Sequence, residues 1–125
     1  MRKFLRHKVV ILVADDDPAV RKALKFSLEL DGFEVHSCAN GEDLLNHPKL
    51  KASDCIVLDY KMPGMNGLEV LEKLKAAQID IPVIFITGPV TKDLRERAMR
   101  KGARLVMEKP LLDKSLSNKI HELTS

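Results

Sequence analysis

Five short apolar runs alternate along this chain with longer segments of helical periodicity, and this alternation constrains the fold more than any other feature. Runs rich in β-branched residues predict strands, and apolar residues three and four positions apart in the intervening segments predict helices. Regular alternation of the two is typical of a doubly wound α/β fold, in which a parallel sheet carries helices on both faces. The predicted strands are 9–14, 33–38, 55–58, 82–86 and 103–107.

The polarity of each run indicates its place in the sheet. The first, third and fourth runs are apolar at successive positions, as expected for central parallel strands that are buried on both faces. The second run contains Glu34 and His36, and the fifth contains Arg104. These two runs are therefore predicted to be the edge strands.

Capping residues mark the predicted starts of three helices. Asp17 stands immediately before Pro18, which is the order of a helix N-cap followed by proline at the first helical position. Asn40 and Asn66, each followed by glycine, open the second and third helices. The capping role explains Asp17 fully, and we give this residue no chemical role.

The last two helices are predicted from their apolar stripes. Val90, Leu94 and Ala98 stand four residues apart, which places them on one face of a fourth helix. Asp113 is expected to cap the fifth helix. The apolar residues of the fifth helix are Leu116, Ile120 and Leu123.

Size and composition favour one domain that folds around its own core. The chain has 125 residues, of which 45% are hydrophobic, and domains of this size bury a substantial apolar core. Its longest apolar run, Val9 to Ala14, has six residues, whereas a membrane span needs roughly 18–20. We expect neither a transmembrane segment nor a secretory leader, and we predict a cytoplasmic location.

The positive charge of the chain gathers at its start. The formal net charge is +3, and the first eight residues contribute four positive charges. Residues 9–125 carry 17 basic and 18 acidic groups, so no basic field covers the domain. We divide the chain into a basic lead-in, 1–7, and one domain, 8–123, and expect this domain to contact neither nucleic acid nor membrane.

The cysteines and histidines do not suggest a metal or redox site. Cys38 and Cys55 lie inside apolar runs without C-x-x-C spacing, so both are predicted to be reduced thiols of the core. The histidines lack the spacing of metal ligands and are assigned no function. They are His7, His36, His47 and His121.

Polar side chains stand at the predicted carboxyl ends of the strands, where ligands bind in an open α/β sheet. The first strand is followed by Asp15 and Asp16, and the third by Asp59. If these strands are neighbours, the three carboxylates converge, and their mutual repulsion requires a cation such as Mg²⁺. The fourth and fifth strands are followed by Thr87 and Lys109.

Each of these residues also has a purely structural explanation. Asp15 and Asp16 would begin a polar loop, and Asp59 would open the turn that follows it. Thr87 would be a strand-end hydroxyl, and Lys109 a solvated lysine. The functional interpretation depends on the combination, because carboxylates, a hydroxyl and a cation together suit phosphoryl transfer to an aspartate. On this interpretation Asp59 is the nucleophile.

Five stretches of the chain form a set that is specific in its order and spacing. They are 13–18 (VADDDP), 58–69 (LDYKMPGMNGLE), 86–88 (ITG), 102–103 (GA) and 108–110 (EKP). Together they resemble the response-regulator receiver domains of bacterial two-component signalling, over residues 8 to about 123. The resemblance is closest in character to receivers of FixJ- and NarL-type regulators. It implies a flavodoxin-like (βα)5 domain with strand order 2-1-3-4-5, whereas periodicity indicates only the alternation.

The resemblance implies roles for the acidic residues. Asp59 aligns with the phosphoacceptor, which receives a phosphoryl group from a histidine kinase or a phosphotransfer protein. Asp16, Asp59 and the backbone carbonyl of Lys61 would bind Mg²⁺, for which Mn²⁺ could substitute. Asp15 would act on the metal through water.

The resemblance also implies a switch. Thr87 and Lys109 would contact the phosphoryl oxygens, and Lys109-Pro110 would form a cis peptide. Phosphorylation would draw Thr87 inward and reshape the face built from the fourth helix, the fifth strand and the fifth helix. An output domain, a target protein or a second phosphorylated copy would bind this face. Such a domain helps to catalyse its own phosphorylation and dephosphorylation but turns over no external metabolite, so it is not expected to be a metabolic enzyme.

Two residues depart from the family pattern. Val106 stands where receivers usually carry a tyrosine or phenylalanine whose ring swings inward on activation, and a β-branched side chain does not offer the same rotamer change. Pro89 stiffens a loop that is usually mobile in the family. Altered switching and neutral substitution are both open for these two residues. Lys61 and Pro89 also occupy positions that tune hydrolysis of the phosphoryl group, and we expect a phosphorylated state of moderate lifetime.

The predicted fourth helix is strongly cationic. Residues 91–101 contain five cations and two anions. This pattern indicates either a solvated helix or a surface for an acidic partner.

Three other functions compete with the receiver interpretation. A docking module that keeps the fold without phosphorylation is favoured by Val106 and disfavoured by the complete set of site residues. A hydrolase with an aspartate nucleophile commonly uses Asp-x-Asp, and Lys61 occupies the place of its second aspartate. A nucleotide-binding fold lacks support, because the chain has neither G-x-G-x-x-G nor a Walker lysine loop. The sequence leaves open whether the domain stands alone or belongs to a longer regulator.

Overall fold

A computed structural model describes residues 8–111 and 114–125. Two predictions, the basic lead-in 1–7 and the cap Asp113, lie outside these described residues. Within them, no helix has the length and apolar character that crossing a membrane requires.

A single parallel sheet forms the centre of the described chain. Its strands are β1 (Val10–Ala14), β2 (Glu34–Cys38), β3 (Cys55–Asp59), β4 (Val83–Thr87) and β5 (Leu105–Glu108). They lie in the order β2-β1-β3-β4-β5 and pair in parallel. This confirms the strand order that the resemblance implies, and it confirms β2 and β5 as the edges. The central strands β1, β3 and β4 are buried at every position, whereas β2 and β5 are partly exposed.

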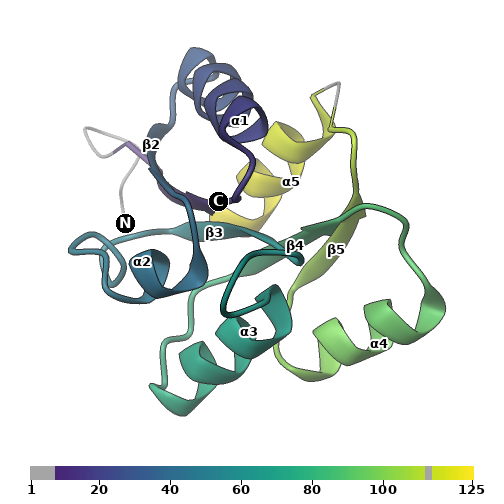
Figure 1. The fold of residues 1–125 in the computed structure, drawn as a ribbon. Helices are drawn as coiled ribbons and strands as arrows, with labels where there is room; N and C mark the ends of the chain where they lie inside the picture. The colour runs from purple at the N-terminus through teal and green to yellow at the C-terminus, as the bar shows by residue number, and fades with distance from the viewer. Residues whose placement is uncertain (1–7, 112–113) are drawn as a thin grey trace.

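Helices cover both faces of the sheet, so the predicted fold class is confirmed. They are α1 (Pro18–Leu30), α2 (Gly41–Leu45), α3 (Gly67–Ala76), α4 (Lys92–Arg100) and α5 (Ser115–Thr124). Figure 1 shows α1 and α5 on one face and α2, α3 and α4 on the other. The sheet therefore lies between two layers of helices.

Successive side chains of the central strands supply the two apolar layers of the core, because they point to opposite faces of the sheet. Leu12 and Leu58 belong to the layer under α2, α3 and α4. Val13 and Val57, the next residue of β1 and the preceding residue of β3, belong to the layer under α1 and α5. All four side chains are fully buried. This burial on both faces explains why the central runs lack polar residues.

Each core layer contains one cysteine. Cys38 lies in the layer under α2, α3 and α4, and Cys55 in the layer under α1 and α5. Both are buried and free, which agrees with the prediction of core thiols. Burial raises the pKa of the Cys38 thiol to about 11 and that of the Cys55 thiol to about 12. Both thiols are therefore protonated at neutral pH.

Three predicted helix caps are confirmed. The Asp17 carboxylate accepts hydrogen bonds from the first turn of α1, and the Asn40 side chain accepts one from the Asp43 N–H of α2. Asn66 and Glu69 form a reciprocal capping box at the start of α3. These side chains satisfy N–H groups that the first turn of a helix leaves without partners.

The start of α4 differs from the prediction. Thr91 is the cap, since its Oγ1 accepts a hydrogen bond from the Leu94 N–H at 3.0 Å. The prediction that Val90 belongs to the helix is wrong, because Val90 lies in the loop before Thr91. Its side chain still packs against the core, which is why its spacing from Leu94 resembles that of a helical stripe.

Candidate functional site

Asp59 ends β3, and the chain folds back closely over this strand end. Asp59 is 4% exposed. A Cβ atom at Gly67 would lie 2.5 Å from the Asp59 carbonyl oxygen and 2.8 Å from the Phe85 ring. The Gly67 N–H also donates to the Tyr60 carbonyl at 2.7 Å. Position 67 therefore requires glycine for the close approach of two backbone segments beside Asp59.

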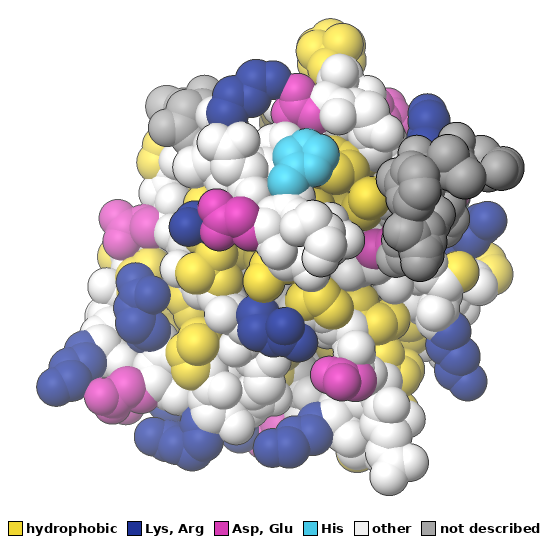
Figure 2. Space-filling view, turned by 180° about the vertical axis from the view of Figure 1, so that it is seen from behind, with side chains coloured by type: hydrophobic (Ala, Val, Ile, Leu, Met, Phe, Trp, Pro, Cys, Tyr) yellow, Lys and Arg dark blue, Asp and Glu magenta, His cyan; other side chains and the backbone are white. Residues whose placement is uncertain are grey.

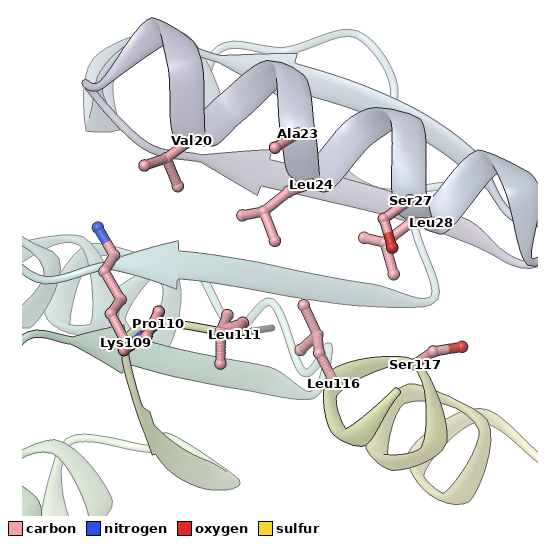
Figure 3. Close-up of a pocket in the computed structure, with 10 residues that line it drawn as sticks. All are labelled: Val20, Ala23, Leu24, Ser27, Leu28, Lys109, Pro110, Leu111, Leu116 and Ser117. Carbon is pink, nitrogen blue, oxygen red and sulfur yellow. The ribbon is translucent and has the colours of Figure 1, made fainter. Parts of the chain in front are cut away.

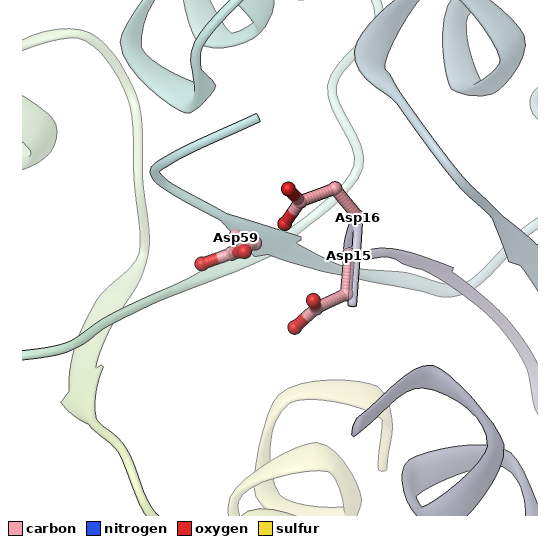
Figure 4. A group of neighbouring side chains, drawn as sticks. All are labelled: Asp15, Asp16 and Asp59. Carbon is pink, nitrogen blue, oxygen red and sulfur yellow. The ribbon is translucent and has the colours of Figure 1, made fainter. Parts of the chain in front are cut away.

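Three carboxylates at the ends of β1 and β3 form one cluster, shown in Figure 4. Asp15, Asp16 and Asp59 each offer an oxygen atom that lies within 4.8 Å of the other two. Asp15 is fully buried and Asp16 is exposed. The Asp17 backbone N–H donates to Asp15 Oδ1 at 2.9 Å and fixes that carboxylate. The carboxylates thus converge as the strand order predicts.

Lys109 follows β5 and places its ammonium beside two of these carboxylates. Its Nζ lies 3.0 Å from Asp15 Oδ2 and 3.2 Å from Asp59 Oδ1. The side chain is 26% exposed, so the alternative of a merely solvated lysine does not hold. The peptide bond from Lys109 to Pro110 is cis, as the resemblance implies.

The electrostatics of this cluster are dominated by burial. Burial raises the pKa of the Asp59 carboxyl to about 6; the charge of Asp15 adds to this rise, and Lys109 opposes it. Burial acts to lower the pKa of the Lys109 ammonium, but its contacts with Asp15 and Asp59 outweigh burial and raise that pKa. Lys109 is therefore charged at neutral pH, and one cation faces two buried carboxylates.

The donor set fits a hard divalent cation. Mg²⁺ prefers oxygen ligands, and the three carboxylates supply more negative charge than Lys109 alone offsets. Asp16 lines an open surface cleft together with Lys61, which places the backbone segment after Asp59 beside the carboxylates. The remaining residues that line this cleft are Tyr60, Met62, Pro63 and Asn66.

Thr87 ends β4, the strand that neighbours β3. It is 4% exposed and follows Ile86, the register partner of Asp59. Its carbonyl accepts a hydrogen bond from the Lys109 N–H at 2.7 Å. The fold thus brings Thr87, Asp59 and Lys109 together at the edge of the sheet formed by the carboxyl ends of the strands.

Val106 of β5 lies in the apolar core of the domain rather than on its surface. It is 4% exposed and pairs in register with Phe85 of β4. Arg95 of α4 lies over it and donates to its carbonyl at 3.5 Å. A valine therefore fills the position at which the resemblance predicts an aromatic ring.

Sequence reasoning missed two contacts near the site. Arg21 donates from Nη1 to the Asp15 carbonyl at 2.7 Å and holds the end of β1. Glu108 accepts a hydrogen bond from the Val90 N–H at 3.0 Å. The one signal for Glu108 in the sequence is its place directly before Lys109.

An apolar groove of about 390 Å³ lies between α1 and α5 and reaches Lys109 (Figure 3). Its walls include Leu24 and Leu28 from α1 and Leu116 from α5. The aliphatic stem of Lys109 lies against this apolar surface while its ammonium reaches the carboxylates, as long cationic side chains commonly do.

The surface of α4 carries the predicted excess of cations. Lys92, Arg95, Arg97 and Arg100 are all exposed. Figure 2, which views the molecule from behind, shows Lys and Arg side chains gathered at the lower left, the corner that α4 occupies. Asp93 pairs with Arg97 at 3.7 Å, and α4 as a whole carries four cations and two anions.

Comparisons with known proteins agree with this arrangement. The family model described as the response regulator receiver domain matches residues 11–121. The transcriptional regulatory protein FixJ of Bradyrhizobium diazoefficiens is 36% identical over 107 residues, which cover 86% of this chain and 52% of that protein. Nodulation protein W of the same species is 33% identical over 87% of this chain and 48% of its own length. The chain thus spans about half the length of these curated relatives.

Solved structures share the fold. The crystal structure titled FixJ-N matches with a TM-score of 0.84 at 33% identity and covers 94% of each chain. The chemotaxis protein CheY4 of Vibrio cholerae matches with a TM-score of 0.86 at 22% identity over 93% of this chain and 98% of that one. The second likeness supports the fold alone.

Proposed function

The chain belongs to the family of response regulator receiver domains of two-component phosphorelay signalling, and on this premise we propose that Asp59 accepts the phosphoryl group. The observation that carries the proposal is the ion-pair geometry of Lys109, whose ammonium lies within 3.2 Å of Asp59 and within 3.0 Å of Asp15. A cation held at this place can neutralise an oxygen of a phosphoryl group on Asp59.

The reaction starts from a phosphohistidine of a histidine kinase or a phosphotransfer protein. A carboxylate oxygen of Asp59 attacks phosphorus, a P–O bond forms, and the P–N bond breaks with its electron pair returning to the imidazole nitrogen. The elevated pKa of Asp59, about 6, still leaves the carboxylate ionised at neutral pH. Thr87 donates a hydrogen bond to a second phosphoryl oxygen.

Asp16, Asp59 and the Lys61 carbonyl would hold Mg²⁺ directly, with Asp15 acting through water and Mn²⁺ as a substitute. When bound, the metal supplies positive charge that offsets the oxygens of the phosphoryl group. The support is the convergence of the three carboxylates.

Phosphorylation in this proposal alters the face formed by α4, β5 and α5, where an output domain, a target protein or a second copy binds. The cations of α4 favour an acidic partner there. The domain acts on itself and turns over no external metabolite. The proposal includes a cytoplasmic location, supported by two free cysteines.

The direct test is the intact mass of the protein after incubation with Mg²⁺ and acetyl phosphate. We expect one phosphoryl adduct on the wild-type chain and none on Asp59→Asn or in EDTA. Asp93→Asn, which changes an exposed aspartate of α4, is the matched control and keeps the adduct. A folded wild-type protein that acquires no adduct, from this donor or from a competent kinase, would make the docking module the better interpretation.

A further inference from the structure

Glu108, the last residue of β5, reaches across to the loop between β4 and α4, residues 88–91. Its Oε1 accepts a hydrogen bond from the Val90 N–H at 3.0 Å. Pro89 has no N–H, so Val90 offers the nearest backbone donor beyond Gly88. The Val90 side chain packs against the core. Both the backbone and the side chain of Val90 are thus held in place.

The consecutive residues Glu108 and Lys109 each form one hydrogen bond near the start of this loop, on either side of Gly88 and Pro89. The Lys109 N–H donates to the Thr87 carbonyl at 2.7 Å, and the Glu108 side chain holds Val90. Thr87 and Glu108 are also register partners in the sheet. Between them, a Cβ atom at Gly88 would meet no heavy atom within 4 Å. The start of the loop is therefore held at its ends rather than by packing at Gly88.

We propose that Glu108 is a positioning residue for Thr87, and that its hydrogen bond to Val90 restrains the loop in its unphosphorylated arrangement. The proposal rests on the proposed function of Asp59. Thr87 reaches a phosphoryl group on Asp59 when the loop shifts, and this shift weakens the Glu108 contact. A contact that is stronger in one of two states biases the equilibrium toward that state.

The composition of the loop favours this coupling. Pro89 has a fixed φ angle, so the loop passes a displacement of Thr87 to Val90 more directly than a loop of freely rotating residues would. Glu108 thereby supplies a link between site and loop that does not depend on an aromatic ring at position 106.

The test compares Glu108→Ala with Glu108→Gln, which keeps an oxygen acceptor. Beryllofluoride with Mg²⁺ serves as the phosphoryl analogue, and its midpoint is measured by titration in amide NMR spectra. The hydrogen exchange of the Val90 amide is measured separately, without metal or analogue. Glu96→Ala, an exposed glutamate of α4, is the matched control.

We expect Glu108→Ala to speed exchange at Val90 and to lower the beryllofluoride midpoint, each by about twofold to tenfold, the range expected for one hydrogen bond. For Glu108→Gln, the exchange rate and the midpoint should both stay within about twofold of the wild-type values. Glu96→Ala should give the wild-type values. An unchanged or raised midpoint for Glu108→Ala would overturn the proposal. Equal effects of the alanine and glutamine variants would also overturn it, because the charge and not the hydrogen bond would then be responsible. A wild-type protein that is folded but binds no beryllofluoride would refute the proposed function as well.

Discussion

At one edge of the sheet, Lys109 lies between the carboxylates of Asp15 and Asp59; along β5, only three residues earlier, Val106 pairs with Phe85 in the apolar core. We call the first region the acidic edge (Asp15, Asp16, Asp59 and Lys109) and the second the switch side (Thr87, Val106, Glu108 and α4). The resemblance implies a role for every residue of the acidic edge, whereas on the switch side Val106 is not the aromatic residue that the resemblance implies.

The two regions differ because different physical forces specify them. At the acidic edge, charges interact at about 3 Å, and replacing Lys109 leaves the buried carboxylates of Asp15 and Asp59 without this cation. At Val106 the requirement is volume and shape, which a different apolar side chain can meet at moderate cost. If the proposed function is correct, we therefore expect the acidic edge to tolerate less change than the switch side, and three predictions test this difference.

The largest effect is expected for Lys109→Met, which keeps the length of the side chain but removes its charge. Phosphorylation of Asp59 by acetyl phosphate should slow by about 100-fold, the size typical of losing one preorganised electrostatic group. The measurement is the time course of the phosphoryl adduct by intact mass. Lys114→Met, at an exposed lysine, is the control and should leave the rate unchanged. A slowing of less than about threefold for Lys109→Met would show that the Lys109 charge does not assist phosphorylation.

A smaller effect is expected on stability, where burial of Asp59 opposes folding. The folded pKa of about 6 lies above the ordinary value of 3.8; hence the unfolded chain releases this proton first as pH rises. As pH rises from 3.8 to about 6, ionisation of Asp59 therefore lowers the free energy of unfolding. This loss of stability is complete above the folded pKa. In EDTA, Asp59→Asn should therefore stabilise the protein at pH 7.5 by about 1–2 kcal/mol relative to wild type, and much less at pH 4.5.

Denaturant unfolding, followed by circular dichroism at both pH values, measures this difference. Each variant is compared with wild type at the same pH, which cancels the titration of other groups. Asp93→Asn, which changes an exposed aspartate of α4, is the matched control. A gain from Asp59→Asn that is equal at both pH values would mean that the charge of Asp59 does not cause it.

The smallest effect on phosphorylation is expected for Val106→Tyr, which introduces the aromatic ring that the resemblance implies. Its extra volume should cost about 1–3 kcal/mol of stability in a packed core, while the phosphorylation rate stays within about twofold of wild type. Denaturation and the mass time course measure the two quantities, with Val106→Ile as the smaller matched change. A rate that falls tenfold or more would show that the acidic edge and the switch side are not independent.

Local patterns allowed most of the elements to be predicted. Burial on both faces makes β1, β3 and β4 continuously apolar, and Asp17, Asn40 and Asn66 cap helices through contacts within three residues. Such signals depend on neighbours in the chain. The strand order came from the resemblance alone, because alternation of strands and helices does not say which strands are adjacent.

The remaining features depend on contacts that are distant in the sequence. Val90 has the same spacing from Leu94 whether it lies in a helix or packs from a loop, so its place could not be predicted. The same holds for its hydrogen bond to Glu108, 18 positions away. The site residues were found because their strands all end at one edge, but the contact of Lys109 with Asp15 required the fold to be known.

The placement of one cysteine in each core layer gives the molecule two internal probes of local unfolding. Cys38 and Cys55 are buried on opposite faces of the sheet, and their protonated thiols react slowly with alkylating reagents until the surrounding layer opens. Labelling rates at the two positions consequently report the opening of the α2–α3–α4 layer and of the α1–α5 layer one by one. Mass spectrometry of the alkylated peptides can therefore show whether the domain unfolds as one cooperative unit or one layer at a time.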